Sequence, residues 1–512
     1  MGSHLCLMPR KPMHLHLQRK LNTFDVTNLV VGSIIGADIY VATGISSRLI
    51  GPSSLLAWVL AGLMATVIAI SFAYCATLFP RVGGPYAYVK EVSTPFNGFI
   101  VGWALLLAEW FSLAVFPVAF AQYFSALTGI NDPVSVLLVK GLFIVFILVT
   151  NIVGVKSAGK TNDILTIAKL SPLLIVVIVG IAFLFLEPAK VASNLNPFFT
   201  GDALAFGQAL VLIFWAYAGF ELSTLPADEV DNPKVTIPRA IAFGMLIVIV
   251  FYLFTNLVVV ASVSQTTLAA SNSPLLDAAN SIFSYLPLIA SAMFVIVGAG
   301  ALVSILGADE SGTIGTSRLT YAMSIDGLLP KFFSRQHPKY NTPYVGLIVL
   351  GVTAFVASVF GGLTALINSS VFLLAFVYLA TCLATLRLLR KHPDPHMQKL
   401  HHIVIPVIGA FFSLALLLLV DPIEIGISVA LLFVGIPVYI FFTPKRELKE
   451  LKAAFYDPHN VVRRAFNQQL EFLAYPVNLI KRAAFKRRGE ELAFKLIADE
   501  DEKDEKMRRD LD

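Results

Sequence analysis

The stretch Val31-Gly-Ser-Ile-Ile-Gly-Ala-Asp-Ile-Tyr-Val-Ala-Thr-Gly44 lies in the first long apolar run of the chain, from Asn28 to Ile50. A run of this length can cross a bilayer as a helix, which needs roughly 20 residues. Its centre, however, holds Gly36 and a carboxylate, Asp38. Glycine costs a helix about 1 kcal/mol relative to alanine, and an aspartate at the bilayer centre costs at least ~2.5 kcal/mol. The stretch predicts a helix broken at mid-membrane that presents backbone groups and Asp38 to a ligand; a continuous helix with a glycine packing face is the alternative.

Composition places the chain in a membrane. Apolar residues make up 57% of its 512 residues and charged residues 14%, against roughly 45–50% and about 25% in soluble domains. Apolar runs separated by glycine, proline and charge predict twelve membrane-spanning helices. The predicted spans are residues 26–49, 53–79, 96–128, 134–155, 163–186, 203–225, 239–262, 287–324, 344–360, 363–389, 402–420 and 424–442. The chain thus divides into an N-terminal tail (1–22), a twelve-helix domain (23–442) and a charged tail (443–512).

Basic residues indicate the orientation of these spans, because cytoplasmic loops carry an excess of lysine and arginine. With the N-terminus inside, the predicted outer loops hold Arg48 and Lys190, whereas the other loop lysines and arginines fall on the inner side. We therefore expect a multi-pass protein of the cell (plasma) membrane with both termini in the cytoplasm. Residues 478–497 alternate apolar and basic side chains, a pattern typical of an amphipathic helix on the anionic inner leaflet or of a solvated helix.

A second irregular stretch lies in the sixth predicted span, Leu212-Ile-Phe-Trp-Ala-Tyr-Ala-Gly-Phe-Glu-Leu-Ser-Thr-Leu-Pro226. It holds Gly219, Glu221 and Pro226 where a membrane helix normally continues without interruption. We therefore predict that the first span is broken at Gly36–Asp38 and that the sixth, five spans later, is broken at Phe214–Gly219. Such a pair is the pattern expected of an inverted-repeat transporter with its binding site near the bilayer midplane. The aromatic residues of this stretch fit either substrate stacking or ordinary core packing.

Ionisable residues deep inside the predicted spans are candidates for function, because their transfer into the membrane is costly. Five are acids and one is a lysine. They are Asp38, Glu109, Glu221, Asp309, Glu310 and Lys169. An excess of buried carboxylate implies that some are protonated, or that a cation spends time among them. Proton coupling and a positively charged substrate both fit; for Glu109, a helix–helix hydrogen bond fits as well.

Several stretches resemble motifs of the amino acid–polyamine–organocation (APC) superfamily of permeases, over about residues 20–442. They are Gly32-Ser-Ile-Ile-Gly36, Phe214-Trp-Ala-Tyr-Ala-Gly-Phe-Glu221, Ala227-Asp-Glu-Val-Asp-Asn-Pro233, Ser317-Arg-Leu-Thr-Tyr-Ala-Met323 and Thr161-Asn-Asp-Ile-Leu-Thr-Ile-Ala-Lys-Leu170. The resemblance implies a LeuT-like fold, which is all-α and integral to the membrane. In that fold spans 1–5 and 6–10 form a 5+5 inverted repeat, helices 1 and 6 are discontinuous, and spans 11 and 12 are peripheral.

The resemblance also implies where a substrate binds, because unwound backbone in spans one and six of that fold receives the α-carboxylate and α-amine of an amino acid. The matching residues are Ser33, Ile35, Gly36 and Ala37 in the first span and Phe214, Trp215, Ala216 and Tyr217 in the sixth, with Asp38 and Gly219 beside them. In sodium-independent relatives, a lysine of the fifth span takes the place of a structural sodium ion. Lys169 matches that lysine, and Asp309 or Glu310 is its expected partner.

Asp38 departs from the family, which usually has glycine at this position. A carboxylate here repels the α-carboxylate of an amino acid, because two like charges ~4 Å apart at an effective dielectric near 20 cost about 4 kcal/mol. Three arrangements avoid this cost. Asp38 binds the ammonium of a cationic substrate, it pairs with Lys169 as a proton-linked switch, or it is protonated and donates a hydrogen bond.

These features predict a secondary transporter, not an enzyme, that carries amino acids or related amines by alternating access. It is expected to be sodium-independent, with proton coupling or exchange through Lys169, Asp309, Glu310, Glu221 and Glu109. No cofactor, metal or nucleic-acid partner is expected, and the histidines within 392–402 are interpreted as a solvated loop rather than a metal site. A potassium-type carrier of the same superfamily and a permease-like sensor that binds without transporting are the alternatives.

Overall fold

The computed structural model describes residues 21–443 except 82, 155–157, 225–229, 286, 395–396 and 398, and at 158–169 it describes the backbone alone. Its regular secondary structure is helical, apart from one isolated bridge between Leu21 and Val230, and turns and loops connect the helices. The all-α prediction is therefore confirmed for the described residues. The first 20 residues and the charged tail beyond Thr443, including the amphipathic helix expected at 478–497, lie outside them.

The helices follow the predicted spans closely, with short helices between some of them. The first half contains α1 (Thr23–Ile34), α2 (Ala37–Ile50), α3 (Ser54–Leu78), α4 (Pro85–Val92), α5 (Pro95–Thr128), α6 (Pro133–Val153), α7 (Ala158–Leu186) and α8 (Pro188–Asn194). The second half contains α9 (Ala203–Trp215), α10 (Pro233–Ser262), α11 (Gln265–Ala270), α12 (Pro274–Ile282), α13 (Pro287–Ile325), α14 (Tyr344–Phe360), α15 (Leu363–Lys391), α16 (His401–Leu419) and α17 (Pro422–Phe442). Two of the short helices, α11 and α12, lie in the loop between α10 and α13.

Proline and capping side chains explain several helix starts. Thr94 and Asp132 precede Pro95 and Pro133, the first residues of α5 and α6. The side chain of Thr94 accepts the Asn97 N–H at 3.2 Å, and the Asp132 carboxylate caps α6 in the same way. Proline fits the first turn because its missing N–H would have no helical partner there, and the capping oxygens satisfy donors that the helix leaves free.

Nine helices of the described chain are long and apolar enough to cross a membrane, or ten if the bent pair Leu170–Leu186 and Pro188–Asn194 forms one span. The count is lower than twelve because α14 has only 17 residues and α1 only 12, and because Ala37–Leu78, which covers α2 and α3, counts as one helix. Twelve spans and the inverted repeat therefore stay predictions. The long helices α5 and α13, with 34 and 39 residues, extend roughly 50–60 Å, which exceeds a bilayer core of about 30 Å.

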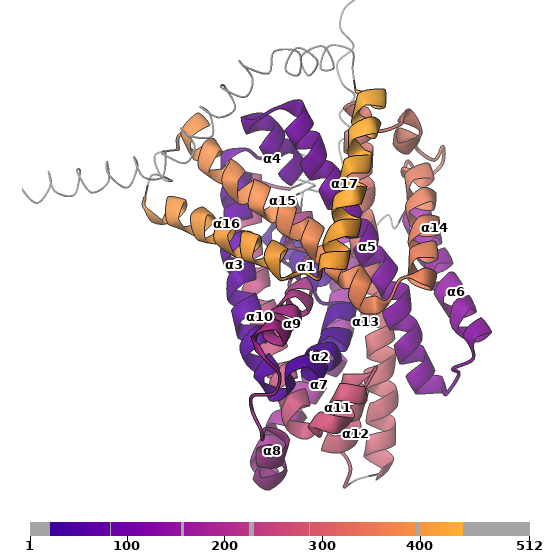
Figure 1. The fold of residues 1–512 in the computed structure, drawn as a ribbon. Coiled ribbons are helices and arrows are strands. Elements are labelled where there is room, and N and C mark those ends of the chain that lie inside the picture. The colour runs from indigo at the N-terminus through magenta and orange to yellow at the C-terminus, as the bar shows by residue number, and fades with distance from the viewer. Residues whose placement is uncertain are drawn as a thin grey trace, which may run out of the picture.

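The two half-helices of the first span lie inside the bundle (Figure 1). α1 packs against α7, α10 and α13, and α2 packs against α9. Helices α6 and α14 pair at one edge, whereas α16 and α17 lie against α15. Large apolar side chains on these outer helices are exposed, among them Leu142 on α6 and Phe411 on α16. Such surfaces suit contact with lipid tails, so the interior between the broken helices is where polar groups gather.

Candidate functional site

The first break separates α1 from α2. α1 ends at Ile34 and α2 begins at Ala37, which leaves Ile35 and Gly36 between the half-helices. The sequence predicts the break at residues 36–38, whereas the structure places Asp38 inside the first turn of α2. The reason for this difference is that the Asp38 side chain bends back, and its Oδ1 accepts the Gly36 N–H at 2.7 Å. A carboxylate in this position stabilises a helix N-terminus through the helix dipole.

The second oxygen of Asp38 is also satisfied. The Tyr252 hydroxyl on α10 donates to Asp38 Oδ2 at 2.7 Å, and the carbonyl oxygen of Ile34 lies 3.1 Å from the same hydroxyl. Tyr252 therefore touches the end of α1 and the start of α2 together. Asp38 is 5% exposed, so its carboxylate is buried and has two donors fixed by the fold.

The second break follows α9, which ends at Trp215. Residues 216–219 form turns and Phe220–Thr224 form a short 3₁₀ helix. The sequence predicts this break over 214–219, and the structure begins it two residues later. Glu221 bends back in the same way as Asp38, because both of its carboxylate oxygens accept the Gly219 N–H, at 3.0 and 3.1 Å. The Tyr378 hydroxyl on α15 donates to Glu221 at 2.9 Å.

The two breaks touch each other. The Ser33 hydroxyl near the end of α1 donates to the Gly219 carbonyl oxygen at 3.1 Å. Gly219 has φ +119°, which side chains rarely adopt, and a Cβ there would lie 2.9 Å from the Ser33 carbonyl oxygen. Gly36 is equally confined, since a Cβ on it would lie 2.4 Å from the Ala308 Cβ on α13. Both positions therefore require glycine, because the neighbouring atoms leave no room for a Cβ.

A buried cavity of about 40 Å³ lies between the two breaks. Its described lining contains three acids, Asp38, Glu109 and Glu221, and no lysine, arginine or histidine. The other lining residues are Ser33, Ile34, Ser112, Leu113, Phe116, Trp215, Ala218, Gly219, Leu222, Ala308, Gly312 and Leu374. At roughly 10–15 Å³ for each water, the cavity has room for about three waters. A solute of amino acid size would need its walls to move apart.

Glu109, on α5, contacts another carboxyl rather than a base. It is 6% exposed and interacts directly with Glu221. Across the described residues, no hydroxyl, amide or basic side chain is hydrogen-bonded to its carboxyl. Two adjacent buried carboxyls cannot both carry a charge without a compensating group, so they share a proton or accept a cation between them.

The other predicted substrate residues are buried around the cavity rather than in its lining. Phe214 and Tyr217 are 0% exposed. Phe214 packs against Tyr378 with ring centroids 6.0 Å apart, and the Tyr217 hydroxyl donates to the Trp58 carbonyl oxygen at 3.1 Å. Ile35, Gly36, Ala37 and Ala216 supply the backbone of the two breaks. The structure thus brings Ser33, Asp38, Trp215 and Gly219 to the cavity, together with Glu109 and Glu221.

The acids of α13 lie apart from this cavity. Asp309 is 1% exposed, and its Oδ1 has no hydrogen-bond partner in the described structure. Glu310 instead accepts a hydrogen bond from the Thr150 hydroxyl on α6 at 2.9 Å. α13 packs against α7, the helix that carries Lys169. The Lys169 side chain lies outside the described residues, so its pairing with Asp309 stays a prediction.

Sequence reasoning missed the two tyrosines that hold the acids. Tyr252 and Tyr378 lie in long apolar helices, where a single hydroxyl carries no recognisable motif. Their role depends on which helices meet, because α10 and α15 bring them to the breaks from distant parts of the chain. Neither spacing nor composition contains that information.

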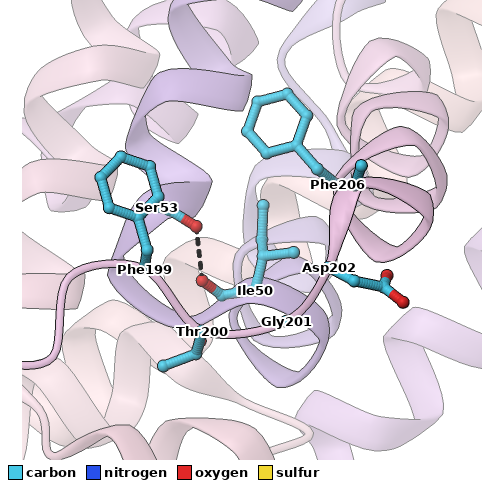
Figure 2. Close-up of a pocket in the computed structure, with 8 residues that line it drawn as sticks. Ile50, Ser53, Phe199, Thr200, Gly201, Asp202 and Phe206 are labelled. Atoms are coloured by element: carbon cyan, nitrogen blue, oxygen red, sulfur yellow. Dashed lines mark hydrogen bonds between the residues drawn. The ribbon is translucent and has the colours of Figure 1, made fainter.

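A larger hollow, of about 260 Å³, lies where the C-terminal end of α2 meets the segment before α9 (Figure 2). Ser53 donates to the Ile50 carbonyl oxygen at 2.7 Å on one wall. The charged residue in the described lining is Asp202, and its carboxylate caps α9 by accepting the Ala205 N–H at 2.8 Å. This hollow offers no group poised for chemistry, so the smaller acid-lined cavity is the candidate site.

Several known proteins are similar in sequence to this chain over nearly its whole helical part. The amino acid permease family matches residues 21–445. The branched-chain amino acid permease BcaP of Bacillus subtilis (strain 168) is 28% identical over 453 residues, covering 84% of this chain and 94% of that protein. From the same organism, the methylthioribose transporter is 27% identical over 460 residues (84% and 95%), and the serine/threonine exchanger SteT is 25% identical over 445 residues (83% and 96%). The chain is a multi-pass membrane transporter that belongs to the amino acid permease family.

Proposed function

We propose that this chain is a sodium-independent secondary transporter of amino acids or related amines that works by alternating access. The observation that carries the proposal is the pair of helix breaks in contact at Ser33 and Gly219, beside a buried cavity lined by acids. Broken backbone and carboxylates at mid-membrane are costly unless they face protein or a watery cavity. A substrate site compensates for that cost, and the small cavity volume implies that the walls open to admit the solute.

The relatives support a small organic substrate of some chemical breadth. One relative is named for branched-chain amino acids and another for serine and threonine. A third is named for methylthioribose, which has no carboxyl group. Family membership therefore supports transport of small organic solutes without requiring that the solute be an amino acid.

The proposed architecture has twelve spans in a 5+5 inverted repeat, with both termini in the cytoplasm and the charged tail on the inner leaflet. Its support is the position of the two breaks, in the first and the sixth predicted spans, where such a repeat requires them. Each break also has a glycine followed two residues later by an acid that accepts the glycine N–H, Gly36 with Asp38 and Gly219 with Glu221.

For coupling, we propose protons or exchange against another solute. The contact between Glu109 and Glu221 supports a shared proton or cation in the cavity. Asp309, buried with one oxygen unpartnered among the described residues, supports a charge partner from α7, for which Lys169 is proposed. Such a lysine would supply the positive charge that a structural sodium ion supplies in sodium-dependent proteins of this fold.

Reconstituted uptake tests this function. The full chain in proteoliposomes is given labelled amino acids and amines at fixed pH, either with equal sodium on both sides or with an inward sodium gradient. We expect the same uptake in both conditions, and uptake that requires the sodium gradient contradicts the proposal. Repeating the assay with and without internal substrate separates exchange from symport, whereas binding without any flux identifies a sensor.

A potassium-type carrier is the second candidate, because Asp38 and two glutamates line the cavity. Uptake of labelled rubidium by the same proteoliposomes decides between the two.

A further inference from the structure

The backbone N–H groups at both breaks are directed at carboxylates of the chain itself. A helix start attracts anions because its first N–H groups lack partners and the helix dipole is positive there. At the start of α2 that anion is Asp38, held by the Gly36 N–H and the Tyr252 hydroxyl at 2.7 Å each. After α9 it is Glu221, held by the Gly219 N–H and by Tyr378.

A built-in carboxylate changes what the cavity can accept. The carboxylate of an incoming amino acid would have to displace Asp38 from the Gly36 N–H or lie beside it as a like charge. For two carboxylates ~4 Å apart at an effective dielectric near 20, that repulsion lowers the affinity for the amino acid about a thousandfold. Among the described lining residues there is no lysine, arginine or histidine to offset it.

The rest of the lining suits a positive charge. Glu109 is buried and aimed into the cavity, where its interaction is with Glu221 rather than with a base. An ammonium group beside these carboxyls supplies positive charge, and it supplies a donor to Glu109, whose carboxyl interacts with Glu221 rather than with an N–H or hydroxyl group of the described residues. The rings of Phe116 and Trp215, with centroids 6.2 Å apart, also line the cavity, and an aromatic ring attracts an organic cation that lies over its face.

We infer that this cavity takes an organic amine without a carboxylate, and that Asp38 occupies the place of the carboxylate that the amine lacks. The inference rests on the proposed transport function of the same cavity. It assigns Asp38 as the residue that determines specificity. The cavity therefore binds an amine more tightly than it binds the amino acid that has the same side chain and also a carboxyl group.

Matched pairs of solutes test this inference with the full-length chain. Leucine is compared with isoamylamine, ornithine with putrescine, and phenylalanine with phenethylamine, in equilibrium binding to the purified protein and in proteoliposome uptake. We expect at least one amine to bind and enter, with the paired amino acid weaker by a factor on the order of a hundred to a thousand.

Two variants separate the charge of Asp38 from the space it occupies. Asp38→Asn keeps the acceptor for the Gly36 N–H but removes the charge, so amine binding should fall at least about tenfold. Asp38→Gly also frees the N-terminus of α2, so amino acid binding should rise above that of the paired amine. Asp277→Asn on α12, whose carboxylate bonds to Ser271 away from the cavity, is the matched control and should leave each ratio unchanged. Melting temperatures verify that every variant is folded.

Each outcome counts for or against the inference. Wild-type protein that binds and imports the amino acid of each pair in preference to the amine overturns it, while the proposed transport function stands. Amine binding without flux supports the inference and overturns transport. Unaltered ratios in folded Asp38→Gly overturn the role of Asp38, and folded wild-type protein that neither binds nor imports any member of the pairs overturns both proposals.

Discussion

Asp38 and Glu221 perform the same task at two distant points of the chain. Each accepts the N–H of a glycine two residues earlier, so each carboxylate replaces a hydrogen bond that the broken helix has lost. The sequence shows both acids and both glycines, and it therefore predicts that the helices break there. It does not show that the side chains bend back, because that depends on the backbone at Gly36 and Gly219 after it has left the helix.

Replacing either glutamate of the Glu109–Glu221 pair should remove the pH dependence of uptake. Two adjacent carboxyls need a shared proton or cation. In Glu109→Gln or Glu221→Gln the new amide can instead donate a hydrogen bond to the remaining carboxylate, so the pair no longer has to take up or release a shared proton. Uptake measured against pH at fixed membrane potential checks this expectation. Asp277→Asn serves as the control, and wild-type pH profiles in both glutamine variants would show that the pair takes no part in coupling.

At the level of elements, the helices were predictable and their partners were not. Apolar runs ended by proline and glycine mark α3, α5, α13, α15 and α17 to within two residues, because length and hydropathy decide whether a segment spans a bilayer. The short helix α4 was not predicted, since its eight residues are too few to cross a membrane or to establish a helical period. Contacts such as Tyr252 with α1 and α2 could not be predicted either, because they depend on helix packing.

Gly219→Ala should distort the contact between the two breaks. Its φ of +119° and the 2.9 Å approach of a Cβ to the Ser33 carbonyl oxygen leave no relaxed position for a methyl group. We expect a loss of about 1–3 kcal/mol in stability and a large loss of uptake, measured by thermal unfolding and in proteoliposomes. Gly426→Ala in α17 is the control, because a Cβ there meets nothing within 4 Å; a Gly219→Ala variant as stable as this control would refute the argument.

The contact between α4 and the end of α15 should make stability depend on pH. Glu91 Oε1 lies 2.8 Å from Lys391 Nζ and 3.1 Å from His392 Nε2. The hydrogen bond from Lys391 is the main cause that holds the pKa of Glu91 below its ordinary value, and His392 adds to it. Because the folded pKa is the lower one, this contribution is complete above the unfolded pKa and is lost as pH falls through the folded pKa.

Glu91→Gln should therefore cost about 0.2–1 kcal/mol at neutral pH, as expected for a partly exposed pair. The difference from wild type should vanish in acid, below the ordinary glutamate pKa of about 4.3. Thermal unfolding measured across this pH range checks the sign, and a difference that grows in acid contradicts it. Lys391→Gln should give a loss of the same order, and the double variant should lose less than the sum.

For the whole molecule, alternating access requires contacts that hold the proposed repeats together in one state and release them in the other. A cluster of this kind joins α4 to the residues after α13. Lys90 Nζ lies 2.9 Å from Asp326 Oδ2, and the Tyr86 hydroxyl donates to the same oxygen at 2.5 Å. Lys90 also donates to the Tyr86 hydroxyl at 3.0 Å. Tyr86 and Lys90 belong to the first proposed repeat and Asp326 to the second, on the side assigned to the cytoplasm.

Asp326→Asn should shift the protein toward the state whose cavity opens to the cytoplasm, because it removes the charge that both α4 side chains share. A partly exposed pair contributes about 0.2–1 kcal/mol, so the equilibrium between the two states should change by up to about fivefold. The readout is the rate at which a membrane-impermeant maleimide, applied from the cytoplasmic side, labels Ser33→Cys in the cavity lining. Asp421→Asn is the matched control, because that carboxylate caps α17 outside both proposed repeats. A rate that rises with Asp326→Asn alone supports the cluster as a lock between the repeats, whereas equal rates in the two variants assign it to local stability.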